Sequence, residues 1–191
     1  MQVDLASGRM LGVTQIVSPN SDSRPPGVEA DLIVVHGISL PPGEFGGPWI
    51  ERLFTNTLRL DAHPYFAEIG AMRVSAHLVI RRDGAITQFV RFTERAWHAG
   101  NSSFDGRIAC NDFSIGIELE GTDTLPYEAV QYAALAEAVA ALCAAYPRLS
   151  PERVVGHSDI APGRKTDPGP AFDWPRARRS IAAACSIADR T

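Results

Sequence analysis

Two short apolar segments, each ending near an ionisable side chain, constrain the fold of this chain most. Residues 32–36 (LIVVH) and 113–119 (FSIGIEL) are rich in β-branched or aromatic residues and are bounded by turn-forming residues, a pattern typical of buried strands. Residues 76–90 hold two further alternating runs around Asp83-Gly84, and Asp-Gly is a strong signal for a two-residue hairpin. The sequence therefore predicts a sheet that contains an antiparallel pair.

Helices are expected beside this sheet. Residues 126–146 form an alanine-rich run with Thr124 as a candidate N-cap, and shorter helices are expected at 48–58 and 174–185. Residues 39–48 contain three prolines and three glycines, so we expect a long surface loop there. This mixture of elements predicts an α/β (α+β) architecture in which helices pack on a central sheet.

Composition limits the kind of protein further. A chain of 191 residues, 45% of them hydrophobic and without repeats or a low-complexity linker, is expected to form one domain over 1–191. Its net charge of −4, with no run of five like charges, argues against a nucleic-acid partner. No apolar stretch approaches the roughly 20 residues needed to span a membrane. We expect no membrane association and a monomer.

The expected compartment is the cytoplasm. The first twenty residues lack a basic stretch followed by a long apolar run, so no secretory signal is expected. The three cysteines are Cys110, Cys143 and Cys185. Their odd number and wide spacing indicate neither a disulfide framework nor a thiolate metal site, which fits a reducing compartment.

Three residues far apart in the sequence form a candidate metal site. His36 closes the first predicted strand, and His157 follows another β-like run and precedes Asp167 in a turn-rich segment. Two imidazoles and one carboxylate are a usual ligand set for catalytic zinc, with the fourth position left to water. The alternative is that each histidine is hydrogen-bonded at the rim of the sheet.

Two glutamates of the second predicted strand are candidate proton-transfer groups. Glu118 and Glu120 are two residues apart and so share one face of the strand. A carboxylate in so apolar a stretch is expensive to bury unless it is paired or functional, which favours a general base. The alternative is an edge strand with both acids in water.

Weaker candidates lie nearby in the sequence. Lys165 could place a positive charge beside a developing oxyanion, or could be solvated. Trp97 and His98 could line a ligand cleft, or could be a core tryptophan and a capped histidine. Arg73 and His77 have the spacing of one strand face and could bind a carboxylate or carbonyl. Tyr65 is the weakest candidate, because its segment also reads as loop packing.

Longer motifs then identify a family. The segments that carry the resemblance are VVHGISLPPGEFGGPW, HPYF, RVSAH, RAWHAG, CNDFSIGIELEGTD and GHSDIAPGRKTDPGPAFDW, in this order. They closely resemble the AmpD-type 1,6-anhydro-N-acetylmuramoyl-L-alanine amidases of the amidase 2 family, which are related to the peptidoglycan recognition proteins. The resemblance spans about residues 30–175.

The resemblance implies a fold, a site and an activity. The fold would be a central mixed sheet flanked by helices. The family's zinc ligands match His36, His157 and Asp167, its catalytic glutamate matches Glu118, and the lysine beside its metal matches Lys165. Arg73, His77, Trp97 and His98 fall in segments around the family's substrate cleft.

The implied enzyme is a bacterial, cytoplasmic zinc amidase. It would cleave the amide between 1,6-anhydro-N-acetylmuramic acid and L-alanine in muropeptides during peptidoglycan recycling, which also lowers the signal that induces β-lactamase. The protein would bind Zn²⁺ and a muropeptide substrate.

The sequence departs from the family pattern at three positions, and two other functions are considered. Gly37 stands where the family usually has asparagine, Gly163 where it has glutamate, and Ser158 where it has cysteine; none removes an implied ligand or the base. A non-catalytic module that recognises peptidoglycan fragments would normally lack one of those groups. An exported amidase acting on polymeric peptidoglycan would normally carry a signal sequence or wall-binding repeats.

Overall fold

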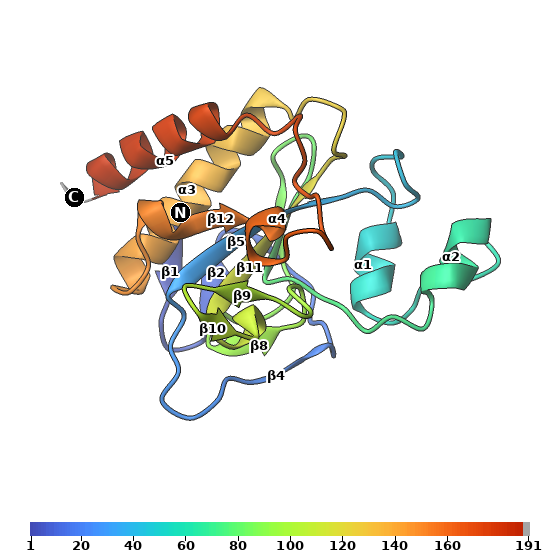
Figure 1. The fold of residues 1–191 in the computed structure, drawn as a ribbon, viewed down its shortest axis with the longest axis horizontal. Helices are drawn as coiled ribbons and strands as arrows, with labels where there is room; N and C mark the ends of the chain where they lie inside the picture. Colours follow the sequence, from blue (N-terminus) through green and yellow to red (C-terminus); the bar gives the residue numbers. More distant parts are fainter. Residues whose placement is uncertain (189–191) are drawn as a thin grey trace.

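A six-stranded sheet organises the computed structural model, which describes residues 1–188 (Figure 1). Its strand order is β12-β5-β11-β6-β7-β3. The strands are β3 (Thr14–Gln15), β5 (Leu32–Ile38), β6 (Leu78–Ile80), β7 (Ile86–Gln88), β11 (Ser114–Glu120) and β12 (Val154–Gly156). All the neighbouring pairs are parallel except β6 and β7, which are antiparallel. The sheet is therefore mixed, as expected, and the hairpin predicted around Asp83-Gly84 is confirmed.

Helices and three two-stranded ribbons surround the sheet. The helices are α1 (Trp49–Phe54), α2 (Pro64–Ile69), α3 (Ala129–Ala145), α4 (His157–Ile160) and α5 (Trp174–Ala188), with 3-10 turns at Cys110–Asp112 and Pro151–Arg153. The ribbons pair β1 (Gln2–Asp4) with β2 (Arg9–Leu11), β4 (Ser21–Ser23) with β8 (Glu94–Ala96), and β9 (Ser103–Phe104) with β10 (Arg107–Ile108). Segments 39–48 and 161–173 hold no helix or strand.

The two predicted strands are the centre of the sheet. Because β5 is covered on both faces, its first four side chains are fully buried, as expected for a parallel strand. On one face, Ile33 and Val35 pack in a core with α3 and α5, which lie together above the sheet in Figure 1. On the other face, Leu32 and Val34 lead to His36. Successive strand residues point to opposite faces, so the polar end of β5 lies on the face away from α3.

The long helix starts later than predicted. α3 begins at Ala129 with Glu128 as N-cap, whose backbone N–H donates to the Gln131 side chain. Thr124 is not the cap. Tyr127 is only 5% exposed and packs in the core, so the chain turns inward before the helix begins. The other predicted helices are present as α1, which ends at Phe54, and α5, whereas α2 and the short α4 were not predicted.

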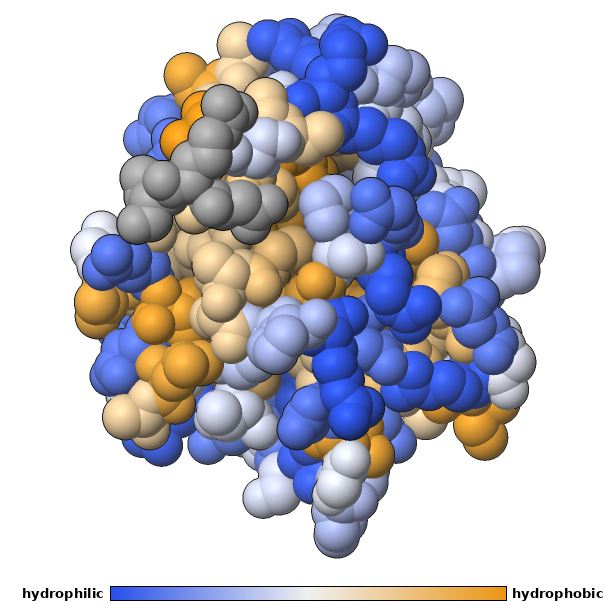
Figure 2. Space-filling view, turned by 90° about the vertical axis from the view of Figure 1, so that its left-hand side faces the viewer, coloured by the Kyte–Doolittle hydropathy of each residue, from blue (hydrophilic) through white to orange (hydrophobic). Residues whose placement is uncertain are grey.

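The surface carries both hydrophobic and hydrophilic side chains (Figure 2). No helix within residues 1–188 is long and apolar enough to cross a membrane. Figure 2 shows the side of the molecule that carries the C-terminal end of α5, where hydrophobic side chains lie among hydrophilic ones. Ile187 of α5 is 64% exposed on the surface.

Candidate active site

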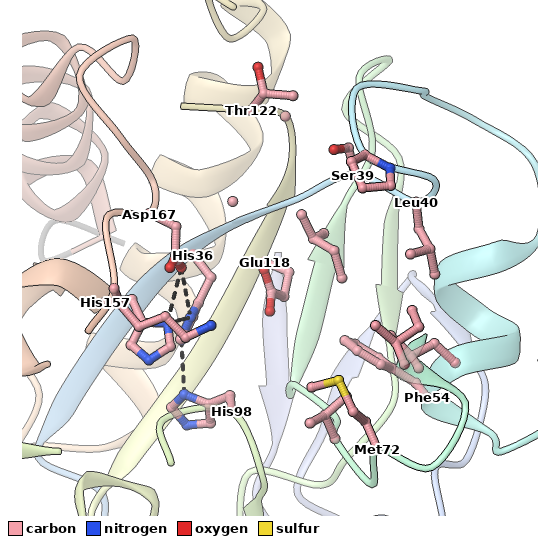
Figure 3. A pocket seen from close by; sticks show the side chains of 18 of the residues that line it. His36, Ser39, Leu40, Phe54, Met72, His98, Glu118, Thr122, His157 and Asp167 are labelled. Atoms are coloured by element: carbon pink, nitrogen blue, oxygen red, sulfur yellow. Dashed lines mark hydrogen bonds and ion pairs between the residues drawn. The ribbon is translucent and has the colours of Figure 1, made fainter. Parts of the chain in front are cut away.

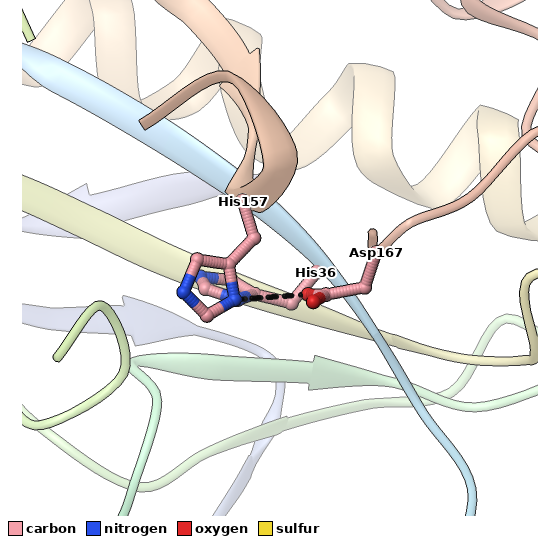
Figure 4. Close-up of side chains that lie close together, drawn as sticks. All are labelled: His36, His157 and Asp167. Atoms are coloured by element: carbon pink, nitrogen blue, oxygen red, sulfur yellow. Dashed lines mark hydrogen bonds and ion pairs between the residues drawn. The ribbon is translucent and has the colours of Figure 1, made fainter. Parts of the chain in front are cut away.

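Three elements bring the predicted metal ligands together. His36 lies near the end of β5, His157 begins α4 directly after β12, and Asp167 lies in the loop that follows α4. β12 and β5 are adjacent and parallel, so their carboxyl ends meet at one edge of the sheet, which is where open α/β sheets bind ligands. Figure 4 shows the three side chains converging from these elements.

The three side chains have the spacing of ligands around one small cation. His36 Nδ1 lies 2.9 Å from His157 Nδ1 and 3.3 Å from Asp167 Oδ2. His157 Nδ1 lies 3.1 Å from the same oxygen. Two ligands at about 2.0 Å from a tetrahedral ion are about 3.3 Å apart. Two imidazoles and a carboxylate at this separation fit a metal such as zinc and leave one position open.

Burial sets the charges of this group. Both histidines are buried. Burial lowers the pKa of His36 to about 4, although the Asp167 carboxylate, which favours the protonated ring, opposes the shift. Burial raises the pKa of Asp167, but the His157 and His36 side chains, which lie within hydrogen-bonding distance of its carboxylate, outweigh that effect and lower the pKa below its ordinary value. The group therefore offers a neutral His36 imidazole and an ionised Asp167 carboxylate, which are the forms that bind metals.

Glu118 lies beside this group on the neighbouring strand. Its position on β11 is paired with that of His36 on β5. Its Oε2 is buried, and no atom of residues 1–188 forms a hydrogen bond to it. Burial, together with the nearby Asp167 carboxylate, raises the pKa of Glu118 to about 8, while Lys165 opposes the shift. A carboxyl group with a pKa near neutrality is suited to take up and release protons.

These groups open into a cavity of about 430 Å³. Figure 3 shows Glu118 projecting between the histidines on one side and Ser39 and Leu40 on the other. Residues from α1 and α2 form the far wall. Lys165, Trp97, His98 and Tyr65 also line this cavity, so the structure brings these sequence candidates to one place.

Arg73 and His77 do not line the cavity. Arg73 is exposed and donates to the backbone oxygens of Gly70 and Met72. His77 is fully buried in the protein, where its Nδ1 accepts from the Gly116 N–H and its Nε2 lies 3.1 Å from the Glu94 carbonyl. Their spacing suggested one strand face, but β6 begins only at Leu78. Residue 73 therefore lies in a surface loop, and the imidazole is held by backbone groups.

The second glutamate has a structural partner. Glu120 Oε1 accepts from Arg81 Nη1 at 2.7 Å and from the Gly46 N–H at 2.6 Å. It is 2% exposed, and Arg81 also donates to the Gly47 carbonyl. Glu120 thus ties the 39–48 loop to β11, whereas Glu118 faces the cavity. The same strand face carries both acids, as predicted.

Two of the sequence departures have structural reasons. A Cβ added at Gly37 would lie 2.4 Å from the Tyr127 hydroxyl, which donates to the Pro168 carbonyl at 3.0 Å. The absent side chain thus leaves room for a tyrosine that holds the residue next to Asp167. Gly163 has a φ of +77°, a backbone conformation that favours glycine.

Several residues that support the site carry no local sequence signal. Tyr127 belongs to the turn before α3, and Ser114 and Gly116 read only as strand residues. Asn111 Oδ1 accepts the backbone N–H groups of His98 and Ala99. The Ala99 carbonyl lies 3.2 Å from His157 Nε2. Each contact joins segments distant in sequence, and the motif CNDFS was the one indication that this segment mattered.

A mixed sheet with a histidine–histidine–aspartate group beside Glu118 fits a hydrolase with a metal cofactor. The family model of the N-acetylmuramoyl-L-alanine amidases matches residues 26–170. The chain is 59% identical over 175 residues to the 1,6-anhydro-N-acetylmuramyl-L-alanine amidase AmpD of Salmonella typhimurium strain SL1344, covering 92% of this chain and 93% of that one.

Solved structures agree with this match. The crystal structure of a selenomethionine derivative of AmpD has a TM-score of 0.91 and 56% identity, with 95% of this chain and 99% of that chain covered. The amidase AmiD of E. coli, solved with anhydro-N-acetylmuramic acid-L-Ala-D-gamma-Glu-L-Lys, has a TM-score of 0.57 and 28% identity, with 90% of this chain and 60% of that chain covered. The chain belongs to the N-acetylmuramoyl-L-alanine amidase family and is of the AmpD type.

Proposed function

We propose that this protein is a zinc-dependent amidase that cleaves 1,6-anhydro-N-acetylmuramic acid from the L-alanine of muropeptides during peptidoglycan recycling. The name of the Salmonella relative supports the anhydro sugar and the bond cleaved. The AmiD complex supports a substrate with an L-alanine-led peptide. We further propose that residues 1–191 form one domain that acts as a monomer in the cytoplasm.

His36, His157 and Asp167 are the proposed zinc ligands. Their donor atoms lie within 4.8 Å of one another, and the site has the neutral His36 imidazole and the ionised Asp167 carboxylate described above. Zinc bound there would supply Lewis acidity, polarising the scissile carbonyl and lowering the pKa of water. Amide hydrolysis needs this help, because an amide carbonyl is weakly electrophilic and its nitrogen leaves poorly unless protonated.

Glu118 is the proposed general base and acid. Its side chain lines the cavity, one of its oxygens has no hydrogen-bond partner in residues 1–188, and its pKa of about 8 equips the group to exchange a proton with an attacking water. The carboxyl group then returns that proton to the departing L-alanine nitrogen. One residue can perform both transfers, because each occurs beside the same reacting carbon.

Lys165 is proposed to stabilise the oxyanion, and Trp97 and His98 to form part of the cavity wall. The ammonium group of Lys165 carries a fixed positive charge at the cavity that holds Glu118. Charge placed where an oxyanion develops contributes roughly 3–4 kcal/mol in other hydrolases. The apolar ring of Trp97 offers surface for the sugar or the peptide.

The single observation that carries the proposal is Glu118, whose buried Oε2 has no hydrogen-bond partner in residues 1–188, beside a ligand trio of the right chemistry. The test is a mass-spectrometric assay with purified protein and anhydro-N-acetylmuramoyl tripeptide. Release of free tripeptide and anhydro-N-acetylmuramic acid is expected, at a rate reduced at least 100-fold in Glu118→Gln. Binding of the intact substrate without cleavage would instead indicate a recognition module.

A further inference from the structure

A chain of hydrogen bonds runs from a metal ligand into the core. His36 Nε2 lies 2.9 Å from His98 Nδ1, a contact drawn in Figure 3. His98 Nε2 lies 3.2 Å from Ser114 Oγ. Ser114 Oγ in turn lies 2.5 Å from the Cys110 carbonyl oxygen. All three side chains are buried.

The Cys110 carbonyl oxygen fixes the donor and the acceptor of every hydrogen bond in this series. A carbonyl oxygen can only accept, so the one hydroxyl hydrogen of Ser114 points to Cys110. Ser114 Oγ must then accept from His98 Nε2–H. A neutral imidazole has one N–H, and the contact with Ser114 places it on Nε2 of the buried His98 ring. His98 Nδ1 is therefore an acceptor.

The consequence reaches the candidate metal site. Because His98 Nδ1 accepts, His36 Nε2 must carry the hydrogen, and the lone pair of His36 is left on Nδ1. That atom is the one that faces His157 Nδ1 and Asp167 Oδ2. We propose that His98 and Ser114 are positioning residues that hold His36 in the Nε2–H tautomer, the form in which its Nδ1 can bind a metal.

The structure provides a fitted place for the His98 ring. A Cβ added at Gly116 would lie 2.4 Å from this ring, so a side chain larger than glycine on β11 would displace it. Ser114 and Gly116 share the strand face of Glu118. The Asn111 side chain accepts the His98 backbone N–H at 3.1 Å. His98 is therefore held at both its ring and its backbone.

This inference rests on the proposed metal site but assigns a role that the reaction itself does not require of His98. Ligand histidines commonly donate their second ring N–H to an oxygen acceptor, and loss of such a partner costs about 10- to 100-fold in metal affinity. Here the acceptor is a second imidazole, which can donate as easily as accept. Which nitrogen of His98 carries the hydrogen therefore depends on Ser114.

The first test reads the tautomers directly in metal-free protein. Long-range ¹H–¹⁵N correlation spectra of the imidazole groups are expected to show both His36 and His98 as Nε2–H tautomers. In Ser114→Ala, the fixed acceptor is lost, so both rings are expected to shift toward mixed tautomers. An Nδ1–H tautomer of His98 in the wild type would overturn the inference, as would unchanged spectra in a folded Ser114→Ala variant.

The second test compares two replacements of His98. The side-chain oxygen of asparagine takes up roughly the place of histidine Nδ1 and can accept, whereas leucine cannot. Zinc dissociation constants from chelator competition are expected to rise about 10- to 100-fold in His98→Leu, and less than about 3-fold in His98→Asn. Equal affinity in His98→Leu and wild type would refute the positioning role.

A matched control separates positioning from general damage to the core. Ser18 is buried and donates to the Phe54 carbonyl, as Ser114 does to Cys110, but it lies outside this chain of bonds. Ser18→Ala is expected to lose stability without altering zinc affinity or the imidazole spectra. If the wild type bound no zinc, the proposed function would fail, while the tautomer measurement would still decide this inference.

Discussion

His36 and Glu118 occupy directly paired positions on the adjacent parallel strands β5 and β11. Their side chains lie on the same face of the sheet, where the cavity opens. A proposed metal ligand and the proposed base are thus held by two adjacent strands in the interior of the sheet. The distance between them is set by strand pairing rather than by a loop.

Neutralising Glu118 tests its proposed role. Glu118→Gln keeps the size of the side chain but removes the proton acceptor, so kcat is expected to fall roughly 10²- to 10⁴-fold. Zinc stoichiometry should stay unchanged, as measured by metal analysis of the purified variant.

The neighbouring acid provides the control. Glu120→Gln removes the charge that pairs with Arg81, so a loss of stability of about 1–3 kcal/mol is expected. Its kcat should remain near that of wild type. A large loss of kcat in Glu120→Gln, with little in Glu118→Gln, would reverse the two assignments.

Lys165 can be tested by chemical modification, because it is the only lysine of the chain. Acetylation removes its charge, whereas reductive dimethylation keeps it. We expect acetylation to lower kcat about 10²-fold and dimethylation to have a much smaller effect. Lys165→Arg, in which only the N-terminal amine can react, should be insensitive to both reagents. Full activity after complete acetylation of wild type would remove Lys165 from the mechanism.

Tyr127 is expected to stabilise the Asp167 segment. Tyr127→Phe deletes the hydrogen bond to the Pro168 carbonyl, so a loss of about 1 kcal/mol of stability is expected. Zinc affinity should fall by a few-fold, because Asp167, the residue directly before Pro168, is freer to move. Gly37→Ala should have a similar effect, since its Cβ would collide with the Tyr127 hydroxyl. Unchanged zinc affinity in both variants would show that Asp167 is held by other contacts.

His77 predicts a pH dependence of stability. Burial, with Arg24 nearby, lowers the pKa of His77 from 6.5 to about 3. Between these values the unfolded chain takes up a proton that the folded protein does not, so the contribution of His77 is complete above pH 6.5 and is lost as the pH falls toward 3. Calorimetry on His77→Gln should show a shallower fall of Tm across this range. A slope equal to that of wild type would contradict the assignment.

The sequence predicted the site better than the contacts that support it. Segments 32–36 and 113–119 are apolar enough to be recognised as central strands, and a histidine and a glutamate at their ends stand out. The spacing of Arg73 and His77 suggested one strand face, because spacing alone cannot distinguish a strand from a surface loop that leads to a buried ring. Their expected place around a substrate cleft came from the family resemblance and not from spacing. The Tyr127 contact depends on how distant segments pack, which local patterns do not encode.

The central claim is that the three-ligand group and Glu118 together perform zinc-dependent amide hydrolysis. The most direct measurement is a zinc titration of chelator-stripped protein, with release of tripeptide from anhydro-N-acetylmuramoyl tripeptide as the signal. The account predicts no activity at the start, a linear rise, and a plateau at one zinc per chain, with no rise in His157→Ala. Full activity in the stripped protein, or a rise in His157→Ala equal to that of wild type, would contradict it.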